Sequence, residues 1–224
     1  MTNLFSKHEG WLIAVITVFF YTSTYFFERG ASIELNIPLD FIAISIPTIA
    51  NDVMSFSILL FPIILTSILL HHYSSNNVDS WINKSALFIY TLIYFIPMYF
   101  YSKDWDSYPL HLLFGFFYAN IICERYKLNV NGFAGKFVIN ASMALLVLSF
   151  TFISLGKVSA DPTNFTKHTT FSLKGKTYVI IKIYDENVFS WPIENDKIIK
   201  NLTHFRLSDM SGVELKESKF GEKN

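Results

Sequence analysis

The residues of this sequence that could do chemistry are a few polar side chains at the edges of long apolar runs, or within them. Asn51 and Asp52 stand together just before such a run. A carboxylate buried among apolar groups is costly, so Asp52 is either a functional group or a residue at the boundary with water. Asp40 falls in the first turn of a short helix expected after Pro38, where the helix dipole favours a negative charge.

Two asparagines lie deeper inside the apolar runs, at positions 120 and 140. An asparagine in such a setting most often hydrogen-bonds a neighbouring helix, at a gain of about 0.6–2 kcal/mol. Both residues therefore favour helix packing or oligomerisation over catalysis. The candidate polar positions predicted from the sequence are Asp40, Asn51, Asp52, Asn120 and Asn140.

The residue patterns typical of enzymes and metal sites are missing from the sequence. His71 and His72 are adjacent, so on a helix they point about 100° apart and cannot hold one metal ion as an i, i+4 pair can. No phosphate loop, nucleophile elbow or zinc-protease motif is present. We therefore predict a protein without enzymatic activity, metal or cofactor. An intramembrane enzyme acting on lipid or peptide is the alternative.

Charge and cysteine content narrow the class of partner. The 224 residues carry 18 basic and 18 acidic side chains, and this balance argues against a nucleic-acid partner, which would favour a basic face. Cys123 is the single cysteine, so a monomer can form no internal disulfide and no cysteine-based metal site.

Five apolar runs without charged residues precede Gly156, and nothing comparable follows them. Runs of this length are typical of membrane spans, because only a closed helix satisfies its own backbone in hydrocarbon. We therefore predict a membrane all-α helical bundle at residues 1–156, with four to five spans because the fourth run is short enough to be re-entrant. The runs are Gly10–Phe27, Val53–Leu70, Ser85–Tyr101, Ser107–Cys123 and Phe137–Gly156.

Lys and Arg in the short loops predict the orientation, because cytoplasmic loops carry an excess of them. With five spans and the N-terminus inside, the inside segments hold five basic residues and the outside loops hold only Arg29 and Lys103. We therefore expect a multi-pass protein of the bacterial inner membrane with its C-terminal tail outside the cytoplasm. With four spans, the tail is cytoplasmic. The five inside residues are Lys7, Lys84, Arg125, Lys127 and Lys136.

The segment Gly30–Asp52 separates the first two runs and is too polar to span. We expect Gly30 to end the first helix. A short helix from Pro38 would then lie in the membrane interface, because its apolar residues are too few to cross.

The hydrophobic pattern changes to a period of two after a polar linker at residues 157–168. Residues 169–224 are predicted to form a small antiparallel β-domain of four or five strands, in which Lys174–Lys176 is a hairpin turn. In the second strand, Val179 and Ile183 are assigned to one face, and Lys182 and Tyr184 to the other. Pro192 indicates that the third strand lies at an edge or ends there.

Three features together resemble a scattered set of small bacterial inner-membrane proteins of uncharacterised function with a C-terminal β-domain. The first run ends in Glu28-Arg29-Gly30 and is followed by Ile37-Pro38 and Phe41-Ile42. The last run ends in Gly156, four residues before Ala160, and the tail opens with Tyr178–Tyr184 and an acidic turn. The resemblance implies the fold and no activity. Similar proteins occur among toxin-immunity and phage-defence genes, so immunity, antiviral defence or envelope sensing are the expected settings.

Two functions are compatible with this organisation. In the first, the protein is a non-enzymatic membrane protein, and its β-domain or its interfacial segment recognises a protein partner. In the second, several copies form a pore or channel lined by polar residues such as Asp52. Lipid and further copies of the chain are expected partners in both.

Overall fold

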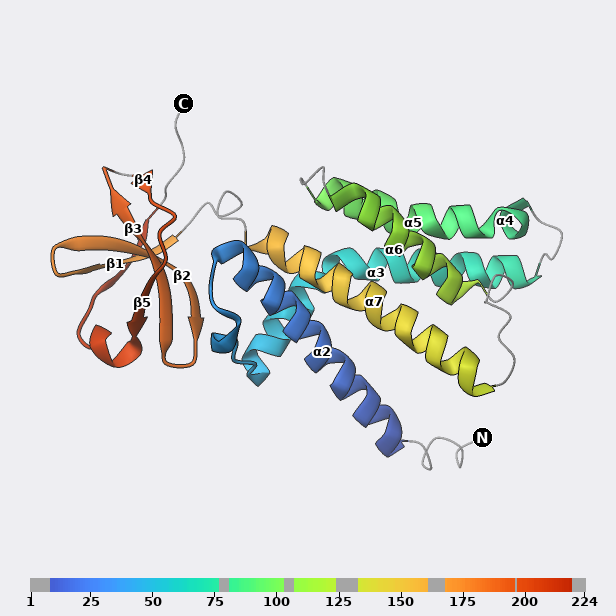
Figure 1. Cartoon of the computed structure of the whole chain (residues 1–224), viewed down its shortest axis with the longest axis horizontal. Coiled ribbons are helices and arrows are strands. Elements are labelled where there is room, and N and C mark those ends of the chain that lie inside the picture. The colour runs from blue at the N-terminus through green and yellow to red at the C-terminus, as the bar shows by residue number, and fades with distance from the viewer. Residues whose placement is uncertain are drawn as a thin grey trace.

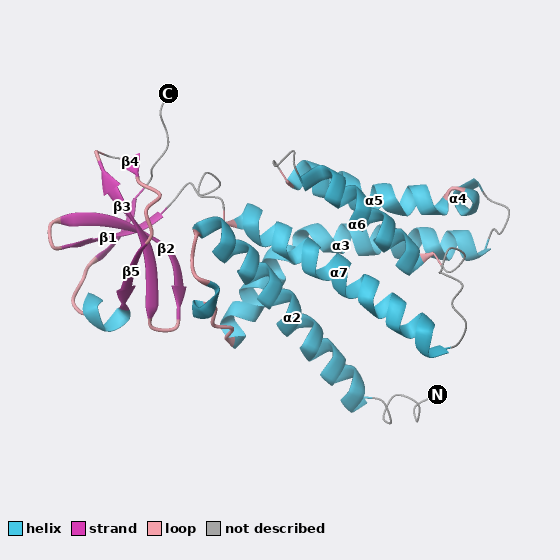
Figure 2. Ribbon diagram, viewed as in Figure 1, coloured by secondary structure: helices cyan, strands magenta, loops and turns pink. Residues whose placement is uncertain are grey.

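The computed structural model describes residues 9–76, 81–102, 107–123, 133–160, 168–195 and 197–218. The chain forms a mostly helical N-terminal part and a C-terminal antiparallel curled sheet, as predicted (Figures 1 and 2). The helices are α2 (Glu9–Leu35), η1 (Leu39–Phe41), α3 (Ile46–Asn76), α4 (Trp81–Lys84), α5 (Ala86–Tyr101), α6 (Tyr108–Ile122) and α7 (Phe133–Ser159). The strands are β1 (His168–Leu173), β2 (Lys176–Tyr184), β3 (Asn187–Glu194), β4 (Lys197–Ile198), β5 (Thr203–Arg206) and β6 (Leu215–Ser218), with η5 (Leu207–Met210) between the last two.

The long helices alternate in direction. α2, α5 and α7 run toward the β-domain, whereas α3 and α6 run away from it (Figure 1). The β-domain therefore sits at the end of the bundle where α2 and α7 finish and α3 begins. Each predicted apolar run lies on one of these five helices, although α2 and α3 extend well beyond their runs.

Gly30 does not end the first helix, contrary to the sequence-based expectation. α2 continues to Leu35, and Gly30 lies where α2 crosses α7. A Cβ atom on Gly30 would fall on the backbone carbonyl of Ile153, and one on Gly156 would fall on the carbonyl of Phe27. The two glycines are thus required by the close approach of two helix backbones, the usual role of small residues at helix crossings in membranes.

The interfacial helix expected after Pro38 is only one turn long. η1 covers Leu39–Phe41, with Asp40 in its first turn as predicted, and α3 already begins at Ile46. Ser45 caps α3 by accepting a hydrogen bond from the Thr48 amide. Asp52 consequently lies on the second turn of α3 rather than in a loop, and only 6% of it is exposed.

The sheet has the strand order β4-β3-β2-β1-β6, and β5 also pairs with β3. β3 is therefore flanked on both sides, and the prediction that it lies at an edge is wrong. β5 pairs with Asn187–Ser190 and β4 pairs with Ile193–Glu194. Pro192 lies in the gap between these two pairings, where its missing N–H leaves no ladder bond unmade.

A β-bulge in β2 decides which side chains face the helices. The pairing of β2 with β3 shifts register between Ile180 and Lys182, which inserts one extra residue. Val179 and Ile181 pack toward the helices, and after the bulge Lys182 and Tyr184 do so as well. The predicted strict alternation of β2 therefore holds up to the bulge and fails after it, leaving Ile183 exposed.

Each face of the curled sheet has its own core. Val179, Phe189 and Trp191 pack against Leu35 and against Ala160 just beyond α7. On the other face, Phe171, Val188 and Met210 form a small core within the β-domain. The β-domain is thus seated on the helix ends through an apolar contact, as expected for so small a sheet.

Two helices in the described residues are long and apolar enough to cross a bilayer, Ile46–Tyr73 of α3 and Val138–Ser159 of α7. In the most apolar 18-residue stretch of each helix, 17% of the residues of α3 and 28% of those of α7 are buried. These fractions are low for core helices of a soluble protein. α5 and α6 are also apolar but shorter.

Candidate functional site

The C-terminal half of α2 carries a stripe of buried polar side chains. Thr24, Glu28 and Ser32 follow one another at a spacing of four residues, so they lie on one face of the helix. All three are fully buried. A buried carboxylate is stable only with charged or hydrogen-bonding partners, so the partners of Glu28 define the candidate site.

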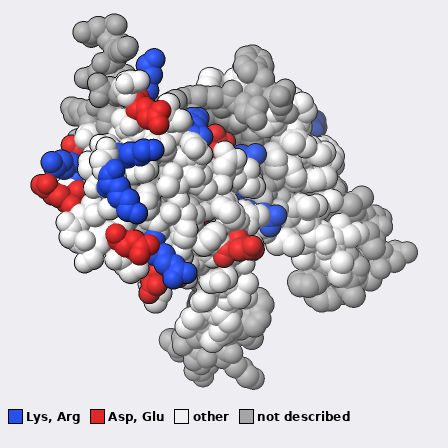
Figure 3. Space-filling view, turned by 60° about the vertical axis from the view of Figure 1, so that its left-hand side comes forward, with Lys and Arg blue, Asp and Glu red and all other residues white. Residues whose placement is uncertain are grey.

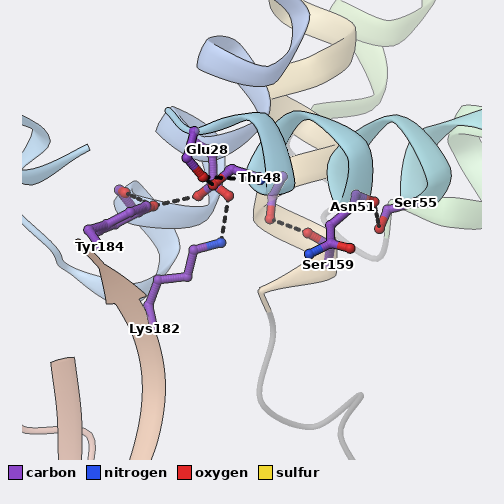
Figure 4. Close-up of polar contacts among 10 residues, drawn as sticks. Glu28, Thr48, Asn51, Ser55, Ser159, Lys182 and Tyr184 are labelled. Carbon is purple, nitrogen blue, oxygen red and sulfur yellow. Dashed lines mark hydrogen bonds and ion pairs between the residues drawn. The ribbon is translucent and has the colours of Figure 1, made fainter. Parts of the chain in front are cut away.

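Two residues of β2 reach across from the β-domain to Glu28 (Figure 4). The ammonium of Lys182 lies 2.6 Å from Glu28 Oε1, and the hydroxyl of Tyr184 donates a 2.5 Å hydrogen bond to Glu28 Oε2. Ser32 is 3.0 Å from the Tyr184 hydroxyl and donates to it, because the phenolic proton is already committed to Glu28. Both oxygens of the Glu28 carboxylate are therefore bound by the β-domain.

Burial raises the pKa of the Tyr184 phenol, and the charge of Glu28 raises it further. The phenol is ordinarily protonated up to a pH of about 10, so the shift extends the range over which it is a donor. Tyr184 is thus a permanent hydrogen-bond donor to Glu28.

Asp52 is the second carboxyl group of the site, supplied by α3. Its side chain is only 6% exposed and lies near both Glu28 and Lys182. The Oδ2 atom of Asp52 is buried without a hydrogen-bond partner. Glu28, Asp52, Lys182 and Tyr184 thus join two helices and the sheet, and we call these four residues the junction cluster.

A cavity of about 270 Å³ adjoins the junction cluster between the helix ends and the sheet. Its walls are apolar at Leu35, Val179 and Trp191, and polar at Lys182 and His168. Lys182 therefore reaches Glu28 along the side of this cavity, and 27% of the lysine side chain is exposed.

The chemistry available to the junction cluster is charge pairing and proton binding. Within the described parts of the chain, no three His, Cys, Asp or Glu side chains gather closely enough to hold a metal ion. Glu28 and Asp52 are two buried acids beside one lysine, so a bound proton can compensate the second negative charge. The ion pair of Glu28 and Lys182 then ties the β-domain to α2.

The five polar positions predicted from the sequence do not form one site. Asp52 alone belongs to the junction cluster, whereas Asp40 and Asn51 are exposed. The amide of Asn120 donates a 2.9 Å hydrogen bond to the Phe116 carbonyl of its own helix. Asn140 is half-buried on α7.

Sequence reasoning missed Glu28, Lys182 and Tyr184 as members of a site. The signal for Glu28 was its place in a four-residue repeat of polar side chains on an otherwise apolar helix. For Lys182 and Tyr184 the signal was weaker, because a strictly alternating strand puts them on the face opposite Val179. Only the bulge turns both toward the helices.

Comparison of the chain with protein-family models, with curated proteins and with solved structures finds no match. The resemblance to small inner-membrane proteins therefore stays an expectation.

Proposed function

We propose that this chain is a multi-pass inner-membrane protein whose β-domain recognises a protein partner from a fixed position on the membrane helices. The observation that supports this most directly is the junction cluster, because its ion pair between Lys182 and Glu28 fastens the β-domain to α2. A domain held in one position presents a single preorganised surface. It therefore loses less conformational entropy on binding a partner than a freely tethered tail would.

Membrane embedding is supported by the apolar surface of the helices. Ile58 of α3 is 79% exposed, and Phe100 of α5 is 78% exposed. Large apolar side chains in such positions are stable in lipid and costly in water. The alternating directions of the five long helices are compatible with five crossings (Figure 1).

The surface available for recognition is the part of the β-domain that does not face the helices. Figure 3 shows side chains of both charges gathered there, while the visible helical surface carries few. Ile183 and Leu215 are exposed among them. A mixed polar surface with isolated apolar residues is typical of non-obligate protein interfaces.

The pore alternative draws less support from the described residues. Asp52 is only 6% exposed and lies near Lys182 of β2, and the Asn120 side chain donates to a carbonyl of its own helix. The proposal of a recognition domain therefore takes precedence over a channel.

Site-specific photo-crosslinking in cells tests the proposal on the full-length chain. A photoreactive residue at Ile183 or Leu215 is expected to give a discrete adduct with another protein, and one at lipid-facing Ile58 is the matched control. Adducts that form only at Ile58, or none at several β-domain positions, would refute recognition by this domain. A periplasmic reporter fused to the C-terminus is expected to be active, and a cytoplasmic one inactive.

A further inference from the structure

The junction cluster contains more buried negative than positive charge. When every group is ionised, Glu28 and Asp52 contribute two negative charges and Lys182 contributes one positive charge. An uncompensated charge away from water is strongly unfavourable, so the site needs one further positive charge when the β-domain is docked. Tyr184 does not supply it, because a phenol is neutral when protonated and negative when ionised.

The geometry of the two acids indicates which positive charge this is. Glu28 and Asp52 are both buried and lie near each other, and two like charges in a buried site favour a proton on one of them. Lys182 and Tyr184 already bind both oxygens of Glu28, while Asp52 Oδ2 is buried without a partner. Asp52 is therefore the acid with a free oxygen to carry the proton.

We propose that the junction cluster is a proton-binding site, and that the proton held by Asp52 against Glu28 is required for the β-domain to dock on the helices. The docked state then binds one more proton than the undocked state, in which both acids reach water and ionise. By linkage, docking weakens as the pH rises, by at most about tenfold per pH unit for one proton. This regulation rests on the proposed role of the cluster as an anchor and does not depend on the identity of the partner.

Other titratable groups near the cluster have to be distinguished from Asp52. His168 of β1 lines the cavity next to Lys182, and histidine ordinarily titrates near neutral pH. Lys157 of α7 and Asp40 of η1 are exposed. Arg29 and Glu34 lie on α2 itself, one residue and six residues beyond Glu28.

Trp191 provides the readout of docking, because only 3% of it is exposed and it packs against the helix ends. The measurement uses a full-length variant in lipid nanodiscs in which phenylalanine replaces the other three tryptophans, at positions 11, 81 and 105. Quenching of Trp191 by acrylamide is measured between about pH 5 and pH 9. We expect quenching to increase as the pH rises, because undocking exposes the indole.

The variant Asp52→Asn is expected to lose this pH dependence, because the neutral amide replaces the protonated acid. Asp40→Asn and His168→Gln are matched controls that should keep it. The same pH response in Asp52→Asn and the parent, or a response abolished only by His168→Gln, would overturn the proposal.

Infrared spectroscopy gives a second measurement that does not rely on docking. The parent protein is expected to show a protonated-carboxyl band at neutral pH that Asp52→Asn removes and Asp40→Asn retains. A parent without such a band would overturn the proton site even if the variants fold poorly. Crosslinking from the β-domain is scored separately, so failure of the proton site and failure of partner recognition are distinguishable.

Discussion

The phenol of Tyr184 donates a 2.5 Å hydrogen bond to the Glu28 carboxylate, and the two residues are 156 positions apart in the sequence. Lys182 binds the other oxygen of the same carboxylate. The first long helix and the second strand of the C-terminal domain therefore depend on each other for charge compensation.

Replacing Lys182 by methionine is expected to destabilise the docked β-domain by roughly 3–5 kcal/mol, because it leaves Glu28 buried without a counter-ion. Thermal unfolding in detergent, followed by Trp191 fluorescence, measures the loss. The double variant Lys182→Met/Glu28→Gln should recover part of the stability. A single variant as stable as the parent would mean that Glu28 has another source of compensation.

Replacing Tyr184 by phenylalanine removes one hydrogen bond to a charged acceptor and is expected to cost about 1.5–3 kcal/mol. Tyr21→Phe is the matched control, because Tyr21 is 53% exposed on the same helix that carries Glu28. Equal unfolding temperatures for the two variants would contradict the role of the Tyr184 hydroxyl.

Gly156→Ala is expected to disrupt the crossing of α2 and α7, since the added methyl group would overlap the Phe27 carbonyl. Gly10→Ala is the control, because nothing lies within 4 Å of its Cβ position. The control should be neutral or slightly stabilising through helix propensity. The two variants are compared by the yield of folded protein and its unfolding temperature, and a Gly156→Ala protein as stable as Gly10→Ala would exclude the close crossing.

Ile58→Lys should impair membrane insertion, because a lysine at the centre of a span costs about 2.5–3.5 kcal/mol. Leu215→Lys places the same change on an exposed apolar residue of the β-domain and should leave insertion unchanged. Membrane fractionation and alkaline extraction separate the two outcomes. If both variants insert equally well, α3 does not face lipid at Ile58.

The helices and hairpins could be predicted because their signals are local. Long uncharged runs marked the five long helices, and Gly175 marked the Lys174–Lys176 turn, in which it adopts a positive φ. The continuation of α2 beyond Gly30 could not be predicted from the sequence alone. Glycine is common at the ends of helices. Gly30 lies inside α2 instead, because a side chain there would collide with the backbone of α7.

The candidate site was only partly predictable for a related reason. Asp52 stood out as an acid beside an apolar run, but its partners lie on α2 and β2 and are far away in sequence. The bulge between Ile180 and Lys182 contains no residue type that would mark it in the sequence of β2. Its effect on side-chain direction depends on the pairing with β3, which the sequence does not specify.

The separation of Glu28 from Lys182 also imposes an order on biosynthesis. A ribosome makes α2 early, and the lysine that neutralises its glutamate emerges only after every other long helix has been synthesised. Throughout that interval the nascent chain carries an acid without its counter-ion. The contact between α2 and the β-domain can therefore form only after the whole helical part has been made.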